Sequence, residues 1–150
     1  MRSWRTTLLT RIDMYRRCPM NSTINSPALN SINYRVFWKD RYSSYEGGNP
    51  AFLKDAGLED SEQIVWLSDY DLPWKDHADR IIREDQEIMT GKISKVMSTT
   101  LLPMADDALH LIHMQKYPIK TSHGLIRGII CVYYELSADL CPTTPHPLKI

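Results

Sequence analysis

The fold-deciding part of the chain consists of three runs: Tyr34-Arg-Val-Phe-Trp-Lys-Asp40, Gly47-Gly-Asn-Pro-Ala-Phe-Leu-Lys-Asp-Ala-Gly57 and Ser68-Asp-Tyr-Asp-Leu-Pro-Trp74. In the first run side chains alternate as in a strand, and residues 42–47 would return beside it as a second strand. The second run breaks that strand with two glycines. Pro50 suits the first position of a short helix, which Gly57 ends. The third run is a loop, because Pro73 limits any helix through it.

Beyond these runs the chain changes from helical to strand periodicity. A short helix is predicted over 61–65. A long helix follows, which Asp76 can cap and Gly91 ends, and its apolar residues recur every three or four positions. Strands are predicted at 95–101, 109–117 and 125–136. Strands at both ends with helices between them predict an α+β fold, a five-stranded antiparallel sheet with helices packed on one face.

The order and spacing of these runs resemble a PAS domain. Three further runs fall where that family places its last two strands: Lys116-Tyr-Pro-Ile119, His123-Gly124 and Gly128-Ile-Ile-Cys-Val-Tyr-Tyr-Glu-Leu-Ser137. The best-preserved runs are similar to those of bacterial sensory PAS domains in sensor histidine kinases and diguanylate cyclases, and the likeness covers about two thirds of the chain. The resemblance implies a PAS-like fold that holds a ligand in a cleft between the sheet and the helices.

Two departures from the family pattern concern a turn and the end of the domain. Trp66 stands where the pattern has a glycine, at a place that usually needs a tight turn. The closing Asp-Ile-Thr of the family becomes Glu135-Leu136-Ser137. In such proteins this motif passes the signal into a helix, so the resemblance implies a signal-transmission role for Glu135, Leu136 and Ser137.

The sequence divides into three parts. Residues 1–33 form a basic N-terminal extension and linker, 34–137 the PAS domain, and 138–150 a Pro-rich C-terminal tail whose prolines oppose the usual signalling coiled coil. We therefore expect the output to be supplied in trans. A truncated remnant of a sensor kinase or cyclase is the other form that this organisation predicts.

Composition narrows the partners and the compartment. The chain has 150 residues, 43% hydrophobic and 24% charged, with a formal net charge of zero and no apolar run of the about 20 residues that span a membrane. These values predict no nucleic-acid partner and no membrane partner. Its three cysteines, Cys18, Cys131 and Cys141, form no C-x-x-C pair, which favours a reducing cytoplasm, and Cys131 is expected to be a buried hydrophobe.

The candidate ligand-binding residues are those that the predicted elements would send toward the cleft. They are Trp38, Asn49, Ile81, Ile82, Asp85, Ile88, Met89 and His113. Asp85 is the ionisable residue on the apolar stripe of the long helix, and a buried carboxylate without a partner is costly. It lies either at the helix edge in water or against a ligand group or a strand residue such as His113.

Cofactor chemistry is weakly supported by the sequence. His77 is the haem-ligand candidate by its place on the long helix, but charged residues follow it, and the flavin-type Asn-Cys-Arg-Phe run is absent. His110 and His113 are three residues apart, so they cannot face one side of a strand as a simple metal pair. Haem and flavin are therefore disfavoured, no metal site is predicted, and the cofactor is unknown.

The resemblance implies a non-enzymatic sensory domain of a bacterial two-component or related signalling system, with no catalytic residues. It would bind a small-molecule ligand or a signalling protein, and the apolar sheet edges favour a homodimer. The alternative from another class is a small α+β cleft enzyme or carrier. Its acid-base groups would be Asp85 with His113, or the pair Asp69 and Asp71, although Asp side chains in such a loop more often cap turns.

Overall fold

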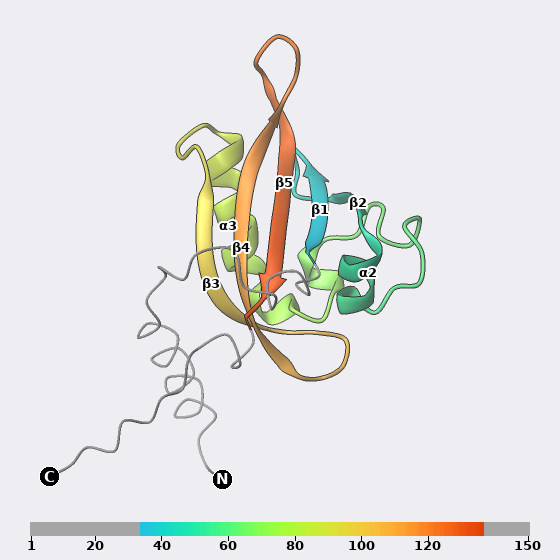
Figure 1. The fold of residues 1–150 in the computed structure, drawn as a ribbon. Coiled ribbons are helices and arrows are strands. Elements are labelled where there is room, and N and C mark those ends of the chain that lie inside the picture. The colour runs from blue at the N-terminus through green and yellow to red at the C-terminus, as the bar shows by residue number, and fades with distance from the viewer. Residues whose placement is uncertain (1–33, 137–150) are drawn as a thin grey trace, which may run out of the picture. The chain divides into compact units, whose positions relative to one another are not determined.

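The computed structural model describes residues 34–136, and they form a five-stranded antiparallel sheet in the order β2-β1-β5-β4-β3 (Figure 1). The elements are β1 (Arg35–Asp40), β2 (Tyr45–Gly48), α2 (Pro50–Ala56), η2 (Asp69–Asp71), η3 (Lys75–His77), α3 (Ala78–Met89), β3 (Val96–Pro103), β4 (Leu109–Lys120) and β5 (Ile126–Glu135). The predicted α+β fold is confirmed. The expectations for residues 1–33 and 137–150, including Ser137, Cys18 and Cys141, lie outside the described residues.

Helix α2 begins and ends where the sequence predicts. Asn49 is its N-cap, and its side-chain oxygen accepts a hydrogen bond from the Phe52 N–H at 3.1 Å. The same oxygen accepts from the Val36 N–H at 3.1 Å, and the amide nitrogen donates to the Tyr34 carbonyl at 2.9 Å. Gly57 ends the helix at φ 77°, in the left-handed region that glycine tolerates. Asn49 therefore joins the start of α2 to β1.

Helix α3 places one stripe of residues against the sheet. Its buried residues are Ala78, Ile81, Asp85 and Ile88, spaced by three and four positions, whereas Ile82 and Met89 are half-buried. His77, and not the predicted Asp76, occupies the N-cap position, because the turn of η3 leads directly into the helix. The predicted short helix at 61–65 is replaced by turns.

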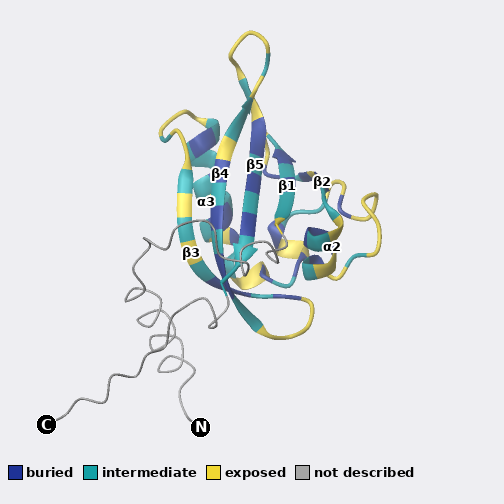
Figure 2. Ribbon diagram, in the orientation of Figure 1, coloured by how far each residue is buried: buried dark blue, intermediate teal, exposed yellow. Residues whose placement is uncertain are grey.

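The core lies between the helices and the inner face of the sheet, where buried and exposed positions alternate along the strands (Figure 2). On β1 the inward residues are Phe37 and Lys39. Trp38 therefore faces away from the core, and a Cβ at Gly47 would lie 2.3 Å from its ring. Phe37 packs among the rings of Tyr45, Phe52 and Tyr133, with centroid separations of 4.8–6.3 Å. This aromatic group forms the floor of the site described below.

Trp66 occupies the turn where the family pattern has a glycine. Its φ is 71°, a left-handed conformation that a bulky residue adopts only under strain, and its side chain is 80% exposed. The Trp66 N–H donates to the Tyr45 carbonyl at 3.0 Å, and the Tyr45 N–H donates to the Leu67 carbonyl at 2.8 Å. These two bonds attach the turn to β2 and hold Trp66 in its strained conformation.

Candidate functional site

Four charged side chains meet in the core, and each is 0% exposed: Lys39, Asp69, Asp85 and Lys116, here called the buried quartet. The Lys39 ammonium lies 2.5 Å from Asp69 Oδ2 and 2.8 Å from Asp85 Oδ2. The Lys116 ammonium lies 2.9 Å from Asp85 Oδ1 and 3.2 Å from Glu84 Oε2. The quartet thus connects β1 and β4 to η2 and α3, with two cations against two fully buried carboxylates.

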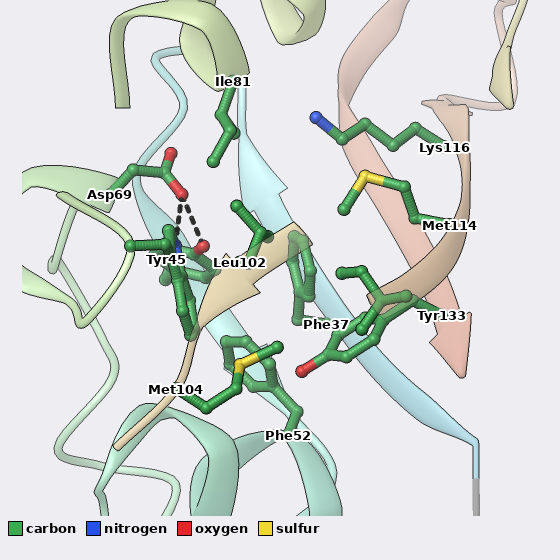
Figure 3. Close-up of a pocket in the computed structure, with 12 residues that line it drawn as sticks. Phe37, Tyr45, Phe52, Asp69, Ile81, Leu102, Met104, Met114, Lys116 and Tyr133 are labelled. Atoms are coloured by element: carbon green, nitrogen blue, oxygen red, sulfur yellow. Dashed lines mark hydrogen bonds between the residues drawn. The ribbon is translucent and has the colours of Figure 1, made fainter. Parts of the chain in front are cut away.

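Asp69 has further partners beside the aromatic floor. Its Oδ1 accepts from the Tyr45 hydroxyl at 2.7 Å and from the Trp74 indole N–H at 3.0 Å (Figure 3). Burial, together with the adjacent Asp69 carboxylate, raises the pKa of Tyr45 well above its usual value. Tyr45 is therefore a neutral hydrogen-bond donor that fixes the orientation of the Asp69 carboxylate.

The quartet keeps its charges because each ion has an opposite charge in contact. Burial alone would raise the pKa of the Asp85 carboxyl, but Lys39 and Lys116 lower it below its usual value. Burial alone would lower the pKa of Lys116, but Asp85 raises it above its usual value. Desolvating an unpaired ion costs several kcal/mol, on the order of the whole stability of a small domain. Asp85 and Lys116 are thus ionised near neutral pH.

The structure decides between the alternatives for Asp85. Its side chain is not at a helix edge in water, so that interpretation is wrong. It pairs with strand residues, as the other interpretation allowed, but these are Lys39 and Lys116. His113 points to the opposite face of β4, where its ring lies 3.1 Å from Thr99 Oγ1, and burial lowers its pKa.

A small pocket lies between the quartet and the aromatic floor, partly open to solvent, with room for about one water molecule. Its lining is mostly apolar and aromatic and consists of Phe37, Tyr45, Phe52, Asp69, Trp74, Ile81, Leu102, Met104, Ile112, Met114, Lys116 and Tyr133. Figure 3 shows Asp69, Ile81 and Lys116 toward one end and Phe52, Met104 and Tyr133 toward the other. The pocket therefore combines an apolar body with a polar end whose charges are already paired.

The pocket includes one of the residues that the sequence nominated for the cleft, Ile81. Trp38 and His113 lie on the other face of the sheet, and Asn49 caps α2. Asp85 lies in the quartet without lining the pocket, and Ile88 is buried elsewhere on α3. Ile82 and Met89 are half-buried and do not line it either.

The nominated acid-base pairs do not converge. Asp69 lies in the quartet, whereas Asp71 accepts hydrogen bonds from the Ser68 N–H at 2.9 Å and the Ser68 hydroxyl at 3.2 Å in a capping box. Asp85 and His113 lie on opposite faces of the sheet. Within residues 34–136, no three His, Cys, Asp or Glu side chains are grouped to hold a metal ion. Cys131 is fully buried, and burial raises the pKa of its thiol to about 12.

Comparison with known proteins identifies the fold through solved structures. A complex of Vibrio cholerae VqmA with ligand and DNA matches with a TM-score of 0.62 at 21% identity, over 85% of this chain and 51% of that chain. The complex of a phage VqmA with DPO matches with a TM-score of 0.60 at 19% identity, over 88% of this chain and 55% of that chain. A sensory box sensor histidine kinase from Vibrio cholerae matches with a TM-score of 0.58 at 14% identity, over 89% of this chain and 99% of that chain. No family model and no curated protein matches the sequence.

The fold is that of a PAS domain. A structure of the PAS domain of a Colwellia psychrerythraea protein also matches, with a TM-score of 0.57 at 14% identity, over 69% of this chain and 86% of that chain. This confirms the resemblance drawn from the sequence. Within the described residues, no helix is long and apolar enough to cross a membrane.

One partner prediction is overturned by these comparisons. The zero net charge predicts no nucleic-acid partner, but VqmA, a protein of the same fold, has been solved in complex with DNA. The chain spans about half the length of the VqmA chains that it matches. Because net charge averages over the residues counted, it does not decide whether a protein that contains this fold contacts DNA.

The sequence analysis missed the two lysines and five aromatic residues that build the site: Lys39, Lys116, Phe37, Tyr45, Phe52, Trp74 and Tyr133. Strand alternation contained part of this signal. Lys116 has the same parity as the inward residues Ile112 and Met114, and Lys39 has the same parity as Phe37. A lysine that continues an apolar inward row predicts a buried carboxylate partner, since an unpaired buried ammonium is costly.

Proposed function

We propose that this PAS fold is a non-enzymatic sensory domain that binds a small molecule in the pocket beside the quartet. The lining of the pocket supports this proposal, because ligand sites are largely apolar concavities with a few convergent polar groups. In this structure the pocket has room for about one water molecule. A small-molecule ligand would therefore bind by moving the lining side chains apart, and the space present does not accommodate a haem or a flavin.

The polar end favours an uncharged ligand. The two buried lysines and two buried aspartates balance one another, so a charged ligand would add an unpaired ion to a dry site. Lys116 has three N–H donors and two hydrogen-bonded carboxylates, which leaves one donor for a neutral acceptor. The rings of Tyr45, Phe52 and Trp74 would contact the apolar body of the ligand.

We propose that the output of this sensor acts on DNA, as part of a receptor or through a partner protein. The likeness to VqmA supports this, since VqmA has been solved with both ligand and DNA and as a dimer. We also propose that the protein forms a homodimer and is located in the cytoplasm of a bacterium. Analytical ultracentrifugation at micromolar concentration tests the dimer, and a single monomeric species would contradict it.

The first experiment is native mass spectrometry of the purified protein, followed by calorimetric titration with DPO as the first probe. Bound extra mass, or heat of DPO binding, would support the ligand proposal. Leu102 lines the pocket, so Leu102→Phe should fill it and abolish binding. Leu101→Phe is the matched control, because Leu101 is equally buried on the same strand but does not line the pocket. Equal binding losses in the two variants would refute pocket binding.

A further inference from the structure

A second group of ionisable side chains, none of which lines the pocket, lies at the end of β5. The ring of His110 on β4 lies between two carboxylates, with Nδ1 2.7 Å from Glu135 Oε1 and Nε2 2.7 Å from Asp106 Oδ2. The His110 side chain is 21% exposed, whereas those of Asp106 and Glu135 are 57% and 42% exposed. One half-buried imidazole thus bridges two separate segments, the β3–β4 turn and the last residue of β5.

Protonation decides whether both contacts can be hydrogen bonds. An imidazolium donates from both ring nitrogens, whereas a neutral imidazole has one N–H and one lone pair. The neutral ring would therefore turn a lone pair toward one of the two carboxylates and lose that bond. Burial alone would lower the pKa of His110, but Glu135 and Asp106 raise it above its usual value. The arrangement favours the protonated form.

Among residues 34–136, the other charged or titratable groups on the inner face toward this end of the sheet are paired with one another. On the inner face near this end, Arg35 of β1 pairs with Asp55 of α2 at 2.9 Å. Asp55 also accepts from the Tyr133 hydroxyl at 2.8 Å, and burial raises the pKa of Tyr133, so that group stays neutral. On β3 the residue opposite His110 is the uncharged Leu102. The carboxylates that hydrogen-bond to the ring are those of Glu135 and Asp106.

The bridge lies where the chain leaves the sheet. Glu135 ends β5 and begins the motif that the family resemblance connects with signal transmission. At the other side of the bridge, Asp106 also accepts from the Ala108 N–H at 3.0 Å, which shapes the turn. The neighbouring Ala105 N–H donates to the Asp55 carbonyl of α2 at 2.9 Å. The bridge therefore connects the exit of β5 to a turn that is itself attached to a helix.

We propose that His110, Asp106 and Glu135 form a proton-operated clasp that holds the end of β5 to the β3–β4 turn when protonated and releases it when the proton is lost. Release would loosen Glu135 and Leu136. The coupling of this release to an output rests on the proposed sensory function, whereas the clasp itself does not. A failed clasp experiment would therefore leave ligand binding intact, and absence of a ligand would leave the clasp intact.

The experiment is an NMR titration of the full chain from pH 5 to 8.5, with His113 as an internal control three residues along the same strand. We expect a higher pKa for His110 than for His113, and lowering of the His110 value by either Glu135→Gln or Asp106→Asn. Amide exchange at Glu135 and Leu136, normalised to intrinsic rates, should speed up about threefold to fivefold above the His110 pKa, the loss expected for one partly exposed bond.

His110→Gln is the test of mechanism, because glutamine cannot titrate in this range. Its exchange at Glu135 should show no pH-dependent step, whereas His113→Gln should retain the wild-type step. Ile130, in the middle of β5, serves as the site where exchange should not change. The clasp is refuted if His110 titrates at or below His113, or if the exchange step survives in His110→Gln.

Discussion

The quartet and the clasp both pair cations with carboxylates on the inner face of one sheet, but they differ in burial and in the type of cation. The quartet uses two lysines at 0% exposure, and although burial alone would lower the pKa of Lys116, Asp85 raises it above its usual value. The clasp uses a half-buried histidine, whose ordinary pKa lies near neutrality. The comparison teaches that the same kind of contact can be a fixed structural element or a titratable one, depending on which cation the sequence supplies.

Breaking the quartet should have the largest effect. Lys39→Met leaves Asp69 and Asp85 short of a cation in the core, so we expect a loss of about 3–5 kcal/mol in the free energy of unfolding, measured by urea denaturation. Lys92→Met is the control, since that ammonium is exposed and 3.4 Å from Glu87, and should cost under about 0.5 kcal/mol. Equal losses would show that the quartet contributes no more than a surface pair.

The two clusters should respond to pH in opposite directions. Because the pKa of folded Asp85 is lowered, its contribution is fully present above the unfolded pKa of about 4 and is lost as the pH falls through the folded value. We expect Asp85→Asn to weaken the acid-dependent loss of stability between pH 5 and 2, measured as urea midpoints. An unchanged acid dependence relative to wild type would contradict this.

Trp66 provides a reference outside both clusters. Trp66→Gly should stabilise the protein by about 1 kcal/mol, because glycine adopts φ 71° without steric strain. Trp66→Ala keeps a Cβ and therefore the strain, so it separates backbone relief from loss of the indole. Thermal unfolding of the two variants checks this, and an equal shift in both would show that the conformation is not the cause.

The clasp should give the smallest effect on stability. The raised pKa of His110 means that its contribution is fully present below the unfolded pKa of about 6.5 and is lost as the pH rises through the folded value. Solvent screening keeps this below about 1 kcal/mol. Urea midpoints at pH 5.5 and 8.5 should differ less in His110→Gln than in wild type, and an equal difference would argue against the contribution.

The sheet and helices could be predicted from the sequence because their signals are local. Pro50 and Gly57 mark the ends of α2, and the apolar spacing of α3 follows from its own residues. The short helix predicted at 61–65 is wrong, because the backbone bonds there are those of successive turns, from the Gln63 N–H to the Asp60 carbonyl and from the Val65 N–H to the Glu62 carbonyl, each at 3.3 Å.

The site was harder to predict because its contacts are long-range. Lys39 reaches carboxylates 30 and 46 residues away, a separation that no periodicity reveals. On β1, the prediction that Trp38 faces the cleft places Phe37 and Lys39 on the outer face of the sheet. That placement is the usual expectation for a lysine in a strand, which normally faces solvent. Alternation gives two faces but does not say which one is inside. Because Lys39 is paired with buried carboxylates, the row of β1 that contains this lysine faces the core.

Because Lys39 and Lys116 are buried, the rate at which they react with an added reagent would measure how often the core opens. Acylating reagents attack the neutral amine of lysine and need access to its nitrogen, and both side chains are 0% exposed and paired with carboxylates. Each can therefore react only during a transient opening of the core beside the pocket. The time course of acetylation at these two positions, read by peptide mass spectrometry, would report how often the pocket wall opens and whether an occupant keeps it shut.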